Sequence, residues 1–395
     1  MSRTAWILEG ARTPLCRYVG SFSDVSAIEL GAAAARGALE RAQVDSSHID
    51  HVIMGNALQT SPDAVFGARH VGLWAGISEE TPALTVNRIC GSGIQSIVLA
   101  AQFLQLGEAD VVLAGGMENM TQAPHVIYGA RKGFALGAGR MQDSLTMAMV
   151  DPFCGFSMAQ TSDNLADRFE ISREQQDGYA FLSQQRAAAA ASRGVFAEEI
   201  VPVEVPTRHG PVTVDEDDHL RPNTTIDGLA ALPPAFEPES YITAGNASGV
   251  VDGAAATVVA SAEWARERGK RPLGKVISWG ICGVDPAYMG IGPVPASKMA
   301  LDRAGWLLDD VDVVEVNEAF AGQYLAVESE LGLDRERTNV NGGAIALGHP
   351  LGATGTRLVY TLLRELHRRG GGRGLATACI GGGQGIAMCV EVDER

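Results

Sequence analysis

The sequence lacks the features that mark membrane, secreted and disordered proteins. No run of about 18 apolar residues is free of polar interruption, which argues against a membrane-spanning helix. The stretch from Met1 to Gly10 has too short an apolar segment for a signal peptide. Low-complexity runs are missing, and the contents of 46% hydrophobic and 20% charged residues are typical of a globular protein. We therefore expect a soluble chain in the cytoplasm.

The chain also lacks a surplus of positive charge. Its 31 Lys and Arg residues face 47 Asp and Glu residues, for a formal net charge of −16. A nucleic-acid or anionic-membrane surface is therefore an improbable main function. An anionic ligand would need local Arg, Lys or backbone N–H groups. We expect no metal site.

Paired cysteines are missing as well. No C-x-x-C motif occurs, so in a cytosolic chain of this size the cysteines are expected to be free thiols. Most free cysteines are small buried apolar residues, and any reactive one must be found by its surroundings. The six are Cys16, Cys90, Cys154, Cys282, Cys379 and Cys389.

What is present is an alternation of strand and helix patterns. At 395 residues the chain is too long for one ordinary core, so we expect two or three subdomains. Short apolar runs and helical spacing alternate in the first part, which predicts an α/β layered sheet. The expected strands are 5–8, 52–54 and 111–114, and the expected helices are 27–42 and 94–106.

The pattern breaks in the middle of the chain and then resumes. The middle is richer in loops, Pro and charge, with one clear helix that a capping box of Ser172 and Gln175 opens. The resumed strands are expected at 256–260, 276–278, 311–316, 375–379 and 386–390. We predict an N-terminal half over 1–118 that 250–271 completes, an inserted loop domain over 119–249, and a C-terminal half over 272–395.

The two halves resemble copies of one unit. In the first, an apolar strand ends at Asn56 and Cys90 follows at the start of a helix. In the second, a strand ends at Asn317 and His349 follows at nearly the same separation. Each helix then leads to an apolar strand that ends in glycines, which favours a duplicated α/β domain.

Cys90 is the first candidate for chemistry. It lies in Asn87-Arg88-Ile89-Cys90-Gly91-Ser92-Gly93, directly before small residues and a helix start. Unpaired N–H groups and the helix dipole at such a position favour a thiolate over a thiol. A thiolate attacks thioesters and forms a new thioester of similar energy. The alternative is a small cysteine at a tight helix–strand contact.

Two further motifs could supply acid–base groups. His349 lies in a glycine-rich loop at the mouth of a helix, and histidine is the natural proton acceptor for a cysteine. Cys379 ends an apolar strand and precedes Gly381-Gly382-Gly383, whose N–H groups could stabilise an oxyanion. Taken singly, a structural histidine and a plain glycine turn are the likelier interpretations. Together with Cys90 they supply a nucleophile, its base and a second acid/base.

The string Asn317-Glu318-Ala319-Phe320 follows a buried strand. An asparagine there can position a water or a carbonyl. A glutamate can hold a neighbouring histidine in one tautomer.

With these motifs in this order, the sequence resembles the thiolase family over essentially its whole length, from Arg12-Thr13-Pro14 to the final strand. It is most similar to the acetyl-CoA acetyltransferase branch, which forms acetoacetyl-CoA. The resemblance implies a duplicated five-layered α-β-α-β-α fold with an inserted loop domain. It also implies a homodimer or homotetramer, with coenzyme A and acyl-CoA as substrates and no permanently bound cofactor.

The resemblance assigns roles to the site residues. Cys90 would carry the acyl group, His349 would take its proton, and Cys379 would move the α-proton of acetyl-CoA. One oxyanion hole would come from His349 and a water held by Asn317. The other would come from the backbone N–H groups of Cys90 and Gly381.

The resemblance also assigns coenzyme A contacts to the inserted segment. Arg221 would lie near the nucleotide, and Ala244 and Ser248 along the pantetheine arm. The tunnel walls would include Phe236, Met158, Met289, Ala319 and Phe320. The chain departs from the branch at Ser157, where a histidine is usual, and at Gly228, where a serine is usual.

Three alternatives stay open. One is a degradative thiolase for longer or branched 3-ketoacyl-CoA. Another is a ketoacyl synthase, although such enzymes use no second catalytic cysteine. The last is an inactive thiolase-like lipid carrier, which would have no need of Cys90, Cys379 and His349 together.

Overall fold

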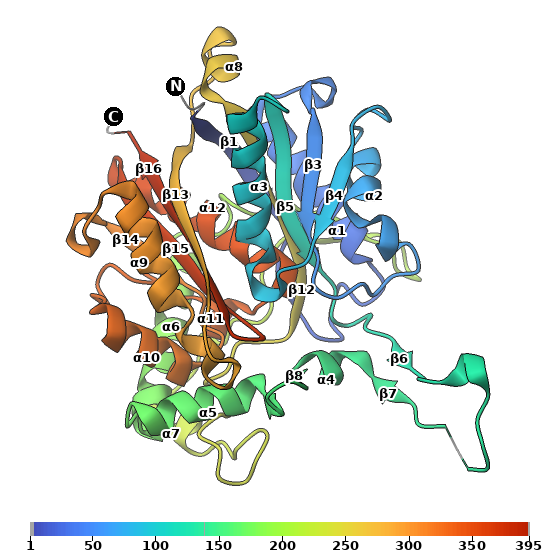
Figure 1. The fold of residues 1–395 in the computed structure, drawn as a ribbon, viewed down its shortest axis with the longest axis vertical. Coiled ribbons are helices and arrows are strands. Elements are labelled where there is room, and N and C mark those ends of the chain that lie inside the picture. Colours follow the sequence, from blue (N-terminus) through green and yellow to red (C-terminus); the bar gives the residue numbers. More distant parts are fainter. Residues whose placement is uncertain (1–3, 138, 394–395) are drawn as a thin grey trace.

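The computed structural model describes residues 4–137 and 139–393, and its centre is one ten-stranded sheet (Figure 1). The strand order is β14-β15-β16-β13-β1-β12-β5-β3-β4, with β2 beside β12. The first half of the chain contributes β1 (Ala5–Arg12), β2 (Cys16–Arg17), β3 (His51–Gly55), β4 (Ala83–Val86), β5 (Val111–Glu118) and β12 (Val251–Ser261). The second half contributes β13 (Gly274–Gly283), β14 (Val313–Val316), β15 (Gly372–Ile380) and β16 (Gln384–Val392).

The sheet divides into two leaves, because β1 and β13 pair only at Trp6↔Lys275 and Ile7↔Gly274. Helices α1 (Ala27–Ala42) and α2 (Gly67–Trp74) cover the outer face of the first leaf. On the far side, α9 (Pro293–Ala304) packs on the second leaf with α10 (Ala321–Leu331) beside it. Between the leaves lie α3 (Ser92–Leu106) and α12 (Leu351–Arg369). The predicted α-β-α-β-α layering is confirmed.

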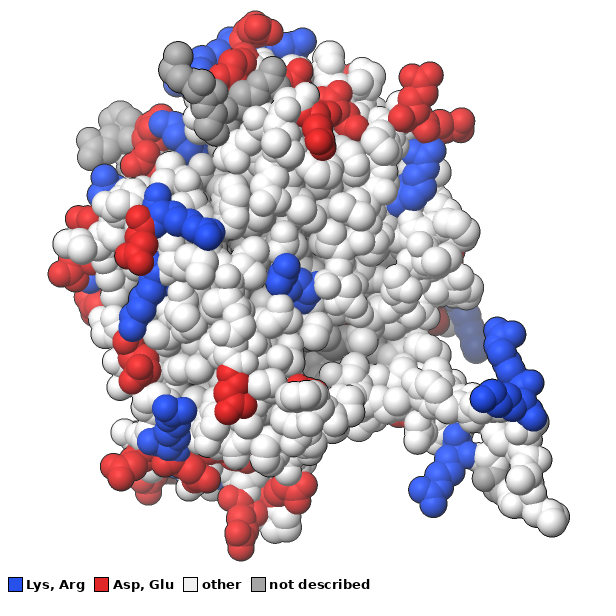
Figure 2. Space-filling view, in the orientation of Figure 1, with Lys and Arg blue, Asp and Glu red and all other residues white. Residues whose placement is uncertain are grey.

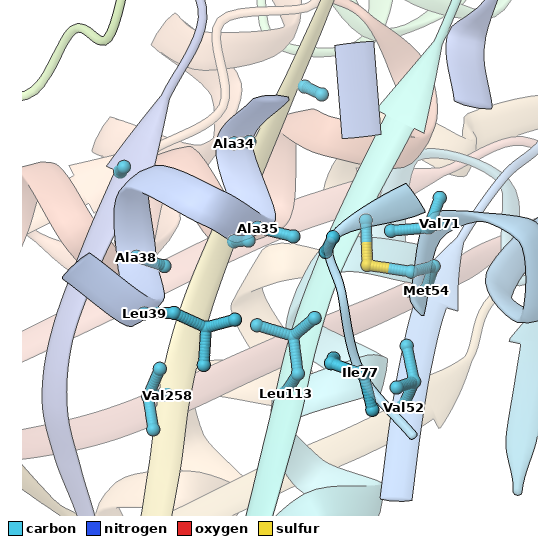
Figure 3. Close-up of a cluster of buried hydrophobic side chains, with 14 of the residues drawn as sticks. Ala34, Ala35, Ala38, Leu39, Val52, Met54, Val71, Ile77, Leu113 and Val258 are labelled. Carbon is cyan, nitrogen blue, oxygen red and sulfur yellow. The ribbon is translucent and has the colours of Figure 1, made fainter. Parts of the chain in front are cut away.

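Small residues let α1 approach the first leaf closely. Figure 3 shows the helix face of Ala34, Ala35, Ala38 and Leu39 over Leu113 and Val258, with further apolar side chains beyond. All of these side chains are buried. Burial of apolar surface stabilises the folded state by about 25 cal/mol for each Å² removed from water, so such a layer is a main source of stability.

The central helix α3 is apolar on most of its surface. By length and composition the window Ile89–Leu106 could cross a membrane, but 61% of it is buried inside the fold, as in the core helix of a globular protein. Glycines bring α3 against α12: a Cβ on Gly93 would lie 2.4 Å from the Thr356 nitrogen, and one on Gly355 would lie 2.3 Å from the Ile94 nitrogen. This close packing brings the starts of the two helices together.

The segment between β5 and β12 forms its own small elements. It contains three two-stranded sheets, β6 (His125–Val126) with β7 (Gln142–Asp143), β8 (Val150–Asp151) with β9 (Phe156–Ser157), and β10 (Val203–Val205) with β11 (Val212–Val214). Its helices are α4 (Ser144–Ala148), α5 (Met158–Arg168), α6 (Arg173–Ser192) and α7 (Ile226–Ala230). Part of it, around β6 and β7, projects from the body as an arm (Figure 1).

The expected elements lie where the periodicity placed them. Helix α1 has the predicted bounds, and α6 begins with the predicted capping box of Ser172 and Gln175. The strands extend past their apolar cores, as β5 does to Glu118. Strand β14 is shorter than expected and begins at Val313, because a 3-10 turn at Leu308–Asp310 precedes it.

Candidate active site

One cavity collects the three residues that the sequence singled out for chemistry. Cys90, His349 and Cys379 all line it, although they come from three different parts of the chain. The first two precede α3 and α12, and the third lies at the end of β15. Most of the other walls of the cavity are apolar side chains.

Cys90 lies in a strained turn just before α3. The residue before it, Ile89, has a φ of 46°, which is unusual for a β-branched side chain. The Asn87 side chain supports this turn, since its Oδ1 accepts the Ile89 N–H at 2.9 Å. Ser92 closes it from the other side, accepting from the Arg88 N–H at 2.8 Å and donating to the Ile89 carbonyl at 2.7 Å. Backbone strain of this kind often accompanies reactive residues.

Burial, however, outweighs the helix terminus in setting the state of the Cys90 sulfur. It raises the pKa of the thiol to about 11, although the backbone N–H groups of Gly381 and of Cys90 itself pull the pKa downward. The nearby Glu118 adds to the rise. The expectation of a resting thiolate is therefore wrong, because the sulfur is desolvated by contacts that the local sequence does not contain. Attack on a thioester needs a base.

The imidazole of His349 is held in one tautomer. Its Nδ1 lies 2.6 Å from the Thr354 hydroxyl, which donates its own proton to the Pro350 carbonyl at 3.0 Å. Because that hydroxyl has no second proton, it must accept from Nδ1, and Nε2 is left with the free lone pair. Burial, reinforced by the charge of Arg357, lowers the pKa of His349 to about 3. The ring is therefore neutral and able to accept a proton.

Asn317 lies against the base nitrogen. Its Nδ2 is 3.3 Å from His349 Nε2, and its buried Oδ1 has no hydrogen-bond partner among the described residues. A buried acceptor without a partner is suited to hold a water. This geometry fits the oxyanion hole expected from His349 and a water.

Glu318 does not hold a histidine in one tautomer, the role considered for it from the sequence. It does not contact a histidine. Its carboxylate accepts hydrogen bonds from Tyr179, Ser183, Asn339 and the Ile345 N–H, at 2.7, 2.7, 3.0 and 3.1 Å. These partners lie on α6 and on the loop that leads to His349, so Glu318 fixes the loop. Thr354 orients the ring instead, a contact between positions five apart that no motif announced.

Cys379 is fully buried and lies near the first thiol. Met289 and Ala319 form an apolar cluster with it. Burial and the proximity of Cys90 both raise the pKa of the Cys379 thiol well above its usual range. The turn that follows needs glycine, because Gly382 and Gly383 both have a φ of 80°. A protonated thiol at this place can give a proton to a carbanion.

The predicted wall residues line the same cavity. They are Met158, Phe236, Met289, Ala319 and Phe320, and Ser248, which was expected along the pantetheine arm, lines the cavity as well. The sequence reasoning missed Met120, Met149, Ala247, Gly249, Val250 and Leu351, which complete the lining. Met120 and Met149 lie in the inserted segment without a recognisable motif, so only the tertiary fold identifies them.

Two of the expected coenzyme A contacts lie at a second cavity. Arg221 and Ala244 line it, as does Gly228, one of the two departures from the family pattern. The segment from Ala244 to Gly249 connects this cavity with the first one, which Ser248 lines. The Ser248 N–H bonds to the Ala319 carbonyl at 3.0 Å. The contacts thus follow one strip of chain toward the thiols.

Ser157, the other departure, turns away from the chemistry. It caps α5 in a capping box with Gln160, with distances of 3.1 and 2.8 Å. Met158, the next residue, then enters the cavity wall. The serine therefore aims a wall residue, and its own hydroxyl is occupied.

Glu118 is a further residue that the motifs did not reveal. Its buried carboxylate accepts from the Asn56 amide and from the N–H groups of Ala57, Leu58 and Gly352, at 2.8 to 3.0 Å. It thereby ties the loop after β3 to the first turn of α12. Burial raises its pKa to about 7. Within the described ranges, 4–137 and 139–393, no cluster of His, Cys, Asp and Glu is arranged to hold a metal ion.

Comparison with known proteins agrees with this geometry. The chain matches the family models "Thiolase, N-terminal domain" over residues 5–263 and "Thiolase, C-terminal domain" over residues 270–392. It is 50% identical over 390 residues to the mitochondrial 3-ketoacyl-CoA thiolase of Homo sapiens, and 47% identical over 386 residues to the acetyl-CoA acetyltransferase of Rhizobium meliloti (strain 1021); each alignment covers 98% of both chains. The crystal structure of the human mitochondrial enzyme in complex with CoA has a TM-score of 0.96 and 49% identity, covering 99% of this chain and 98% of that one. The chain therefore belongs to the thiolase family of acyltransferases.

Proposed function

We propose that this thiolase cleaves 3-ketoacyl-CoA with coenzyme A, and runs the reverse condensation, through an acyl group carried on Cys90. The observation that carries the proposal is the shared cavity of Cys90, His349 and Cys379. Two thiols and a neutral imidazole are the groups that this chemistry requires. A ketoacyl synthase would have no use for the second thiol.

In the cleavage direction, His349 Nε2 takes the proton of Cys90, and the sulfur attacks the 3-keto carbonyl carbon. The 3-keto oxygen becomes an oxyanion, which one of the two expected pairs of hydrogen-bond donors stabilises: His349 with a water held by Asn317, or the backbone N–H groups of Cys90 and Gly381. The bond between C2 and C3 then breaks, and the acyl group stays on Cys90. The carbanion of acetyl-CoA takes a proton from Cys379, and the proton first removed from Cys90 restores that thiol.

The second half of the cycle releases the acyl group. Coenzyme A gives its thiol proton to His349, attacks the acyl carbon and displaces the Cys90 sulfur. The sulfur recovers the proton from His349, so the enzyme returns to its starting state. The raised pKa of Cys90, about 11, explains why the sulfur needs His349 in each half of the cycle.

Coenzyme A binds along the strip from Arg221 and Ala244 to Ser248. An anionic nucleotide meets a chain of net charge −16, so its phosphates need a local cation, and Arg221 is exposed at the second cavity. The human relative whose structure contains CoA supports this choice of substrate.

The acyl group is accommodated by a wall rich in methionine. Met120, Met149, Met158 and Met289 surround the cavity. Unbranched thioether side chains repack around ligands of different shape. This observation favours a thiolase that accepts acyl chains longer than that of acetoacetyl-CoA over one that is specific for acetoacetyl-CoA. Measurement of kcat/KM for a series of 3-ketoacyl-CoA substrates of increasing length decides between these two specificities.

Mass spectrometry tests the central proposal. After mixing with acetyl-CoA, the wild-type chain should carry one acetyl group on Cys90, and Cys90→Ala should carry none. Cys379→Ala should acylate at the normal extent but lose about 10³-fold in thiolysis, as expected when a general acid is removed. An acetyl adduct that forms on Cys90→Ala as readily as on wild type would overturn the assignment.

The assembly is proposed to be a homodimer or homotetramer. The support is the arm around β6 and β7, which exposes apolar side chains away from the body (Figure 1). The exposed set includes Ile127, Tyr128, Phe134, Leu136 and Met141. Apolar groups gathered on a projection indicate a protein contact. The cytoplasmic location stays a prediction.

A further inference from the structure

A buried pair of ionisable groups, Glu315 and Arg357, lies next to the catalytic elements and has no part in the mechanism above. Burial raises the pKa of the Glu315 carboxyl to about 8 and lowers the pKa of the Arg357 guanidinium. Arg357 Nη1 is 3.5 Å from Glu315 Oε2, and the side chains are 2% and 0% exposed. Neither carboxyl oxygen and neither terminal guanidinium nitrogen makes a hydrogen bond within the described residues. The pair is therefore joined by one long ion-pair contact, without a hydrogen bond from these four atoms to the protein.

The position of the pair relates it to the base. Glu315 belongs to β14 and lies two residues before Asn317, so the side chains of the two project toward the same side of the chain. Arg357 lies three residues after Thr354 on α12, on the same helix face. The contact between Asn317 and His349 and the contact between Glu315 and Arg357 therefore join the same two elements.

Strand β14 needs such a connection. It is the last strand of the sheet and pairs only with β15 on one side. On its other side it bonds to the short segment Arg337–Asn339. Backbone hydrogen bonds therefore fix β14 within the sheet, whereas side-chain contacts set its distance from α12.

Stability alone gives a weak reason for the pair. Charged groups lose their hydration on burial, and a pair without hydrogen bonds recovers little of that loss. Apolar side chains of similar size are often equal or better for stability. The geometry points instead to a function at the neighbouring base.

We propose that Glu315 and Arg357 are positioning residues for His349: they hold β14 and α12 at the separation at which Asn317 meets the imidazole. This inference rests on the proposed role of His349 as the base for Cys90. Glu315 and Arg357 then affect the reaction through His349, without touching the substrate themselves.

Besides Glu315, three other charged groups act on the guanidinium. Glu199 lies before β10, Arg12 on β1, and Glu318 after β14. Glu365, further along α12, acts on Glu315. Among the residues that the structure describes, Arg357 is the one charged group that lowers the pKa of His349, in addition to the larger effect of burial. Removal of its charge should therefore raise that pKa, whereas an exchange for lysine should not.

Three variants test the proposal: Arg357→Met, Arg357→Lys, and the doubly apolar Glu315→Leu/Arg357→Met. The measurement is the single-turnover acetylation of Cys90 by acetyl-CoA across pH, with KM and the thermal midpoint recorded for each variant. Arg357→Met should slow acetylation about 10- to 100-fold, with KM nearly unchanged. The acid limb of its pH profile should move to higher pH.

Lysine should recover most of the rate and the wild-type acid limb. The doubly apolar variant should regain the thermal midpoint but stay slow, and it carries the test if Arg357→Met does not fold. Wild-type acetylation rates in the doubly apolar variant, or an unmoved acid limb in Arg357→Met, would overturn the inference alone. A wild-type chain that acetylates elsewhere than Cys90 would instead overturn the proposed function.

Discussion

The reactivity of the centre depends on side chains that flank His349 on both of its ring nitrogens. The Thr354 hydroxyl accepts a hydrogen bond from the Nδ1–H group, and Asn317 lies against Nε2. Neither neighbour is a carboxylate, so the ring gains no charge partner that would raise its pKa. A neutral ring with so low a pKa takes the proton of a thiol only while the substrate is being attacked.

Thr354→Val should slow acetylation of Cys90 about 10- to 100-fold, because the ring loses the partner that keeps its proton on Nδ1. Thr354→Ser is the matched control and should keep most of the rate, since it retains the hydroxyl. Rapid-quench measurement of acetyl transfer gives the comparison. Equal rates for the valine and wild-type chains would show that the tautomer is set by something else.

Glu118 links stability to pH. Its pKa is raised from 4.5 to about 7 in the folded chain, because burial outweighs the four N–H donors around it. A raised carboxyl pKa means that its contribution to stability is complete below about pH 4.5 and is lost as the pH rises toward 7. The loss amounts to about 3 kcal/mol, at 1.36 kcal/mol for each pKa unit.

Glu118→Gln should flatten the dependence of the unfolding free energy on pH over this window, relative to wild type. Urea titrations at several pH values provide the measurement, and the exposed Glu80→Gln is the control. A wild-type slope that persists in Glu118→Gln would mean that the donors keep the carboxylate ionised. Asp252 has the same sign of shift, so the difference between variants is the informative quantity.

At the scale of elements, two helices of the inserted segment begin in the same way but have different neighbours. Both α5 and α6 open with a serine capping box, at Ser157 and Ser172. Only α5 begins at the cavity, through Met158. A Cβ on Gly381 would lie 3.1 Å from the Met158 sulfur, so the start of α5 also packs against the glycine turn after Cys379.

Ser157→Ala and Ser172→Ala should each cost about 1 kcal/mol of stability, the usual price of an N-cap. Only Ser157→Ala should also change KM for 3-ketoacyl-CoA, because it loosens Met158 in the cavity wall. Chemical denaturation and steady-state kinetics on both variants separate the two effects. A change of KM in Ser172→Ala of the same size would remove Ser157 from substrate positioning.

Local patterns predicted the elements well and their mutual contacts poorly. Apolar runs located the strand interiors, and the Ser172 capping box located the start of α6, since both depend on neighbouring residues. The pKa of Cys90 was predicted in the wrong direction because its desolvation comes from distant segments. Glu318 was matched with a histidine although its partners are Tyr179 and Asn339, which the chain brings from far away.

At the scale of the whole molecule, charge is distributed unevenly. Figure 2 shows Lys and Arg side chains on the projecting arm, on a face whose body carries scattered charges of both signs. The arm contains Arg131, Lys132 and Arg140 in a chain of net charge −16. The arm therefore combines exposed apolar groups with positive charge in a chain whose net charge is negative, which suits contact with the acidic surface of another copy.

Tyr128→Asp combined with Phe134→Asp should convert the assembly to a smaller one, because two apolar groups of the contact become charged. Acetylation of Cys90 should persist, since neither residue lines the cavity. Light scattering after size exclusion gives the mass. Leu106→Asp, which alters an exposed position on the body at 72% exposure, is the control and should leave the mass unchanged.

The meeting of α3 and α12 between the leaves has a practical consequence for anyone who handles this enzyme. Cys90 comes from one copy of the repeated unit and His349 from the other. Under the proposed mechanism, a polypeptide in which only one copy has folded therefore cannot transfer an acyl group. A titration of the acetyl groups that acetyl-CoA transfers to Cys90 would therefore count the fully folded molecules. It could report the refolding yield without a separate assay of structure.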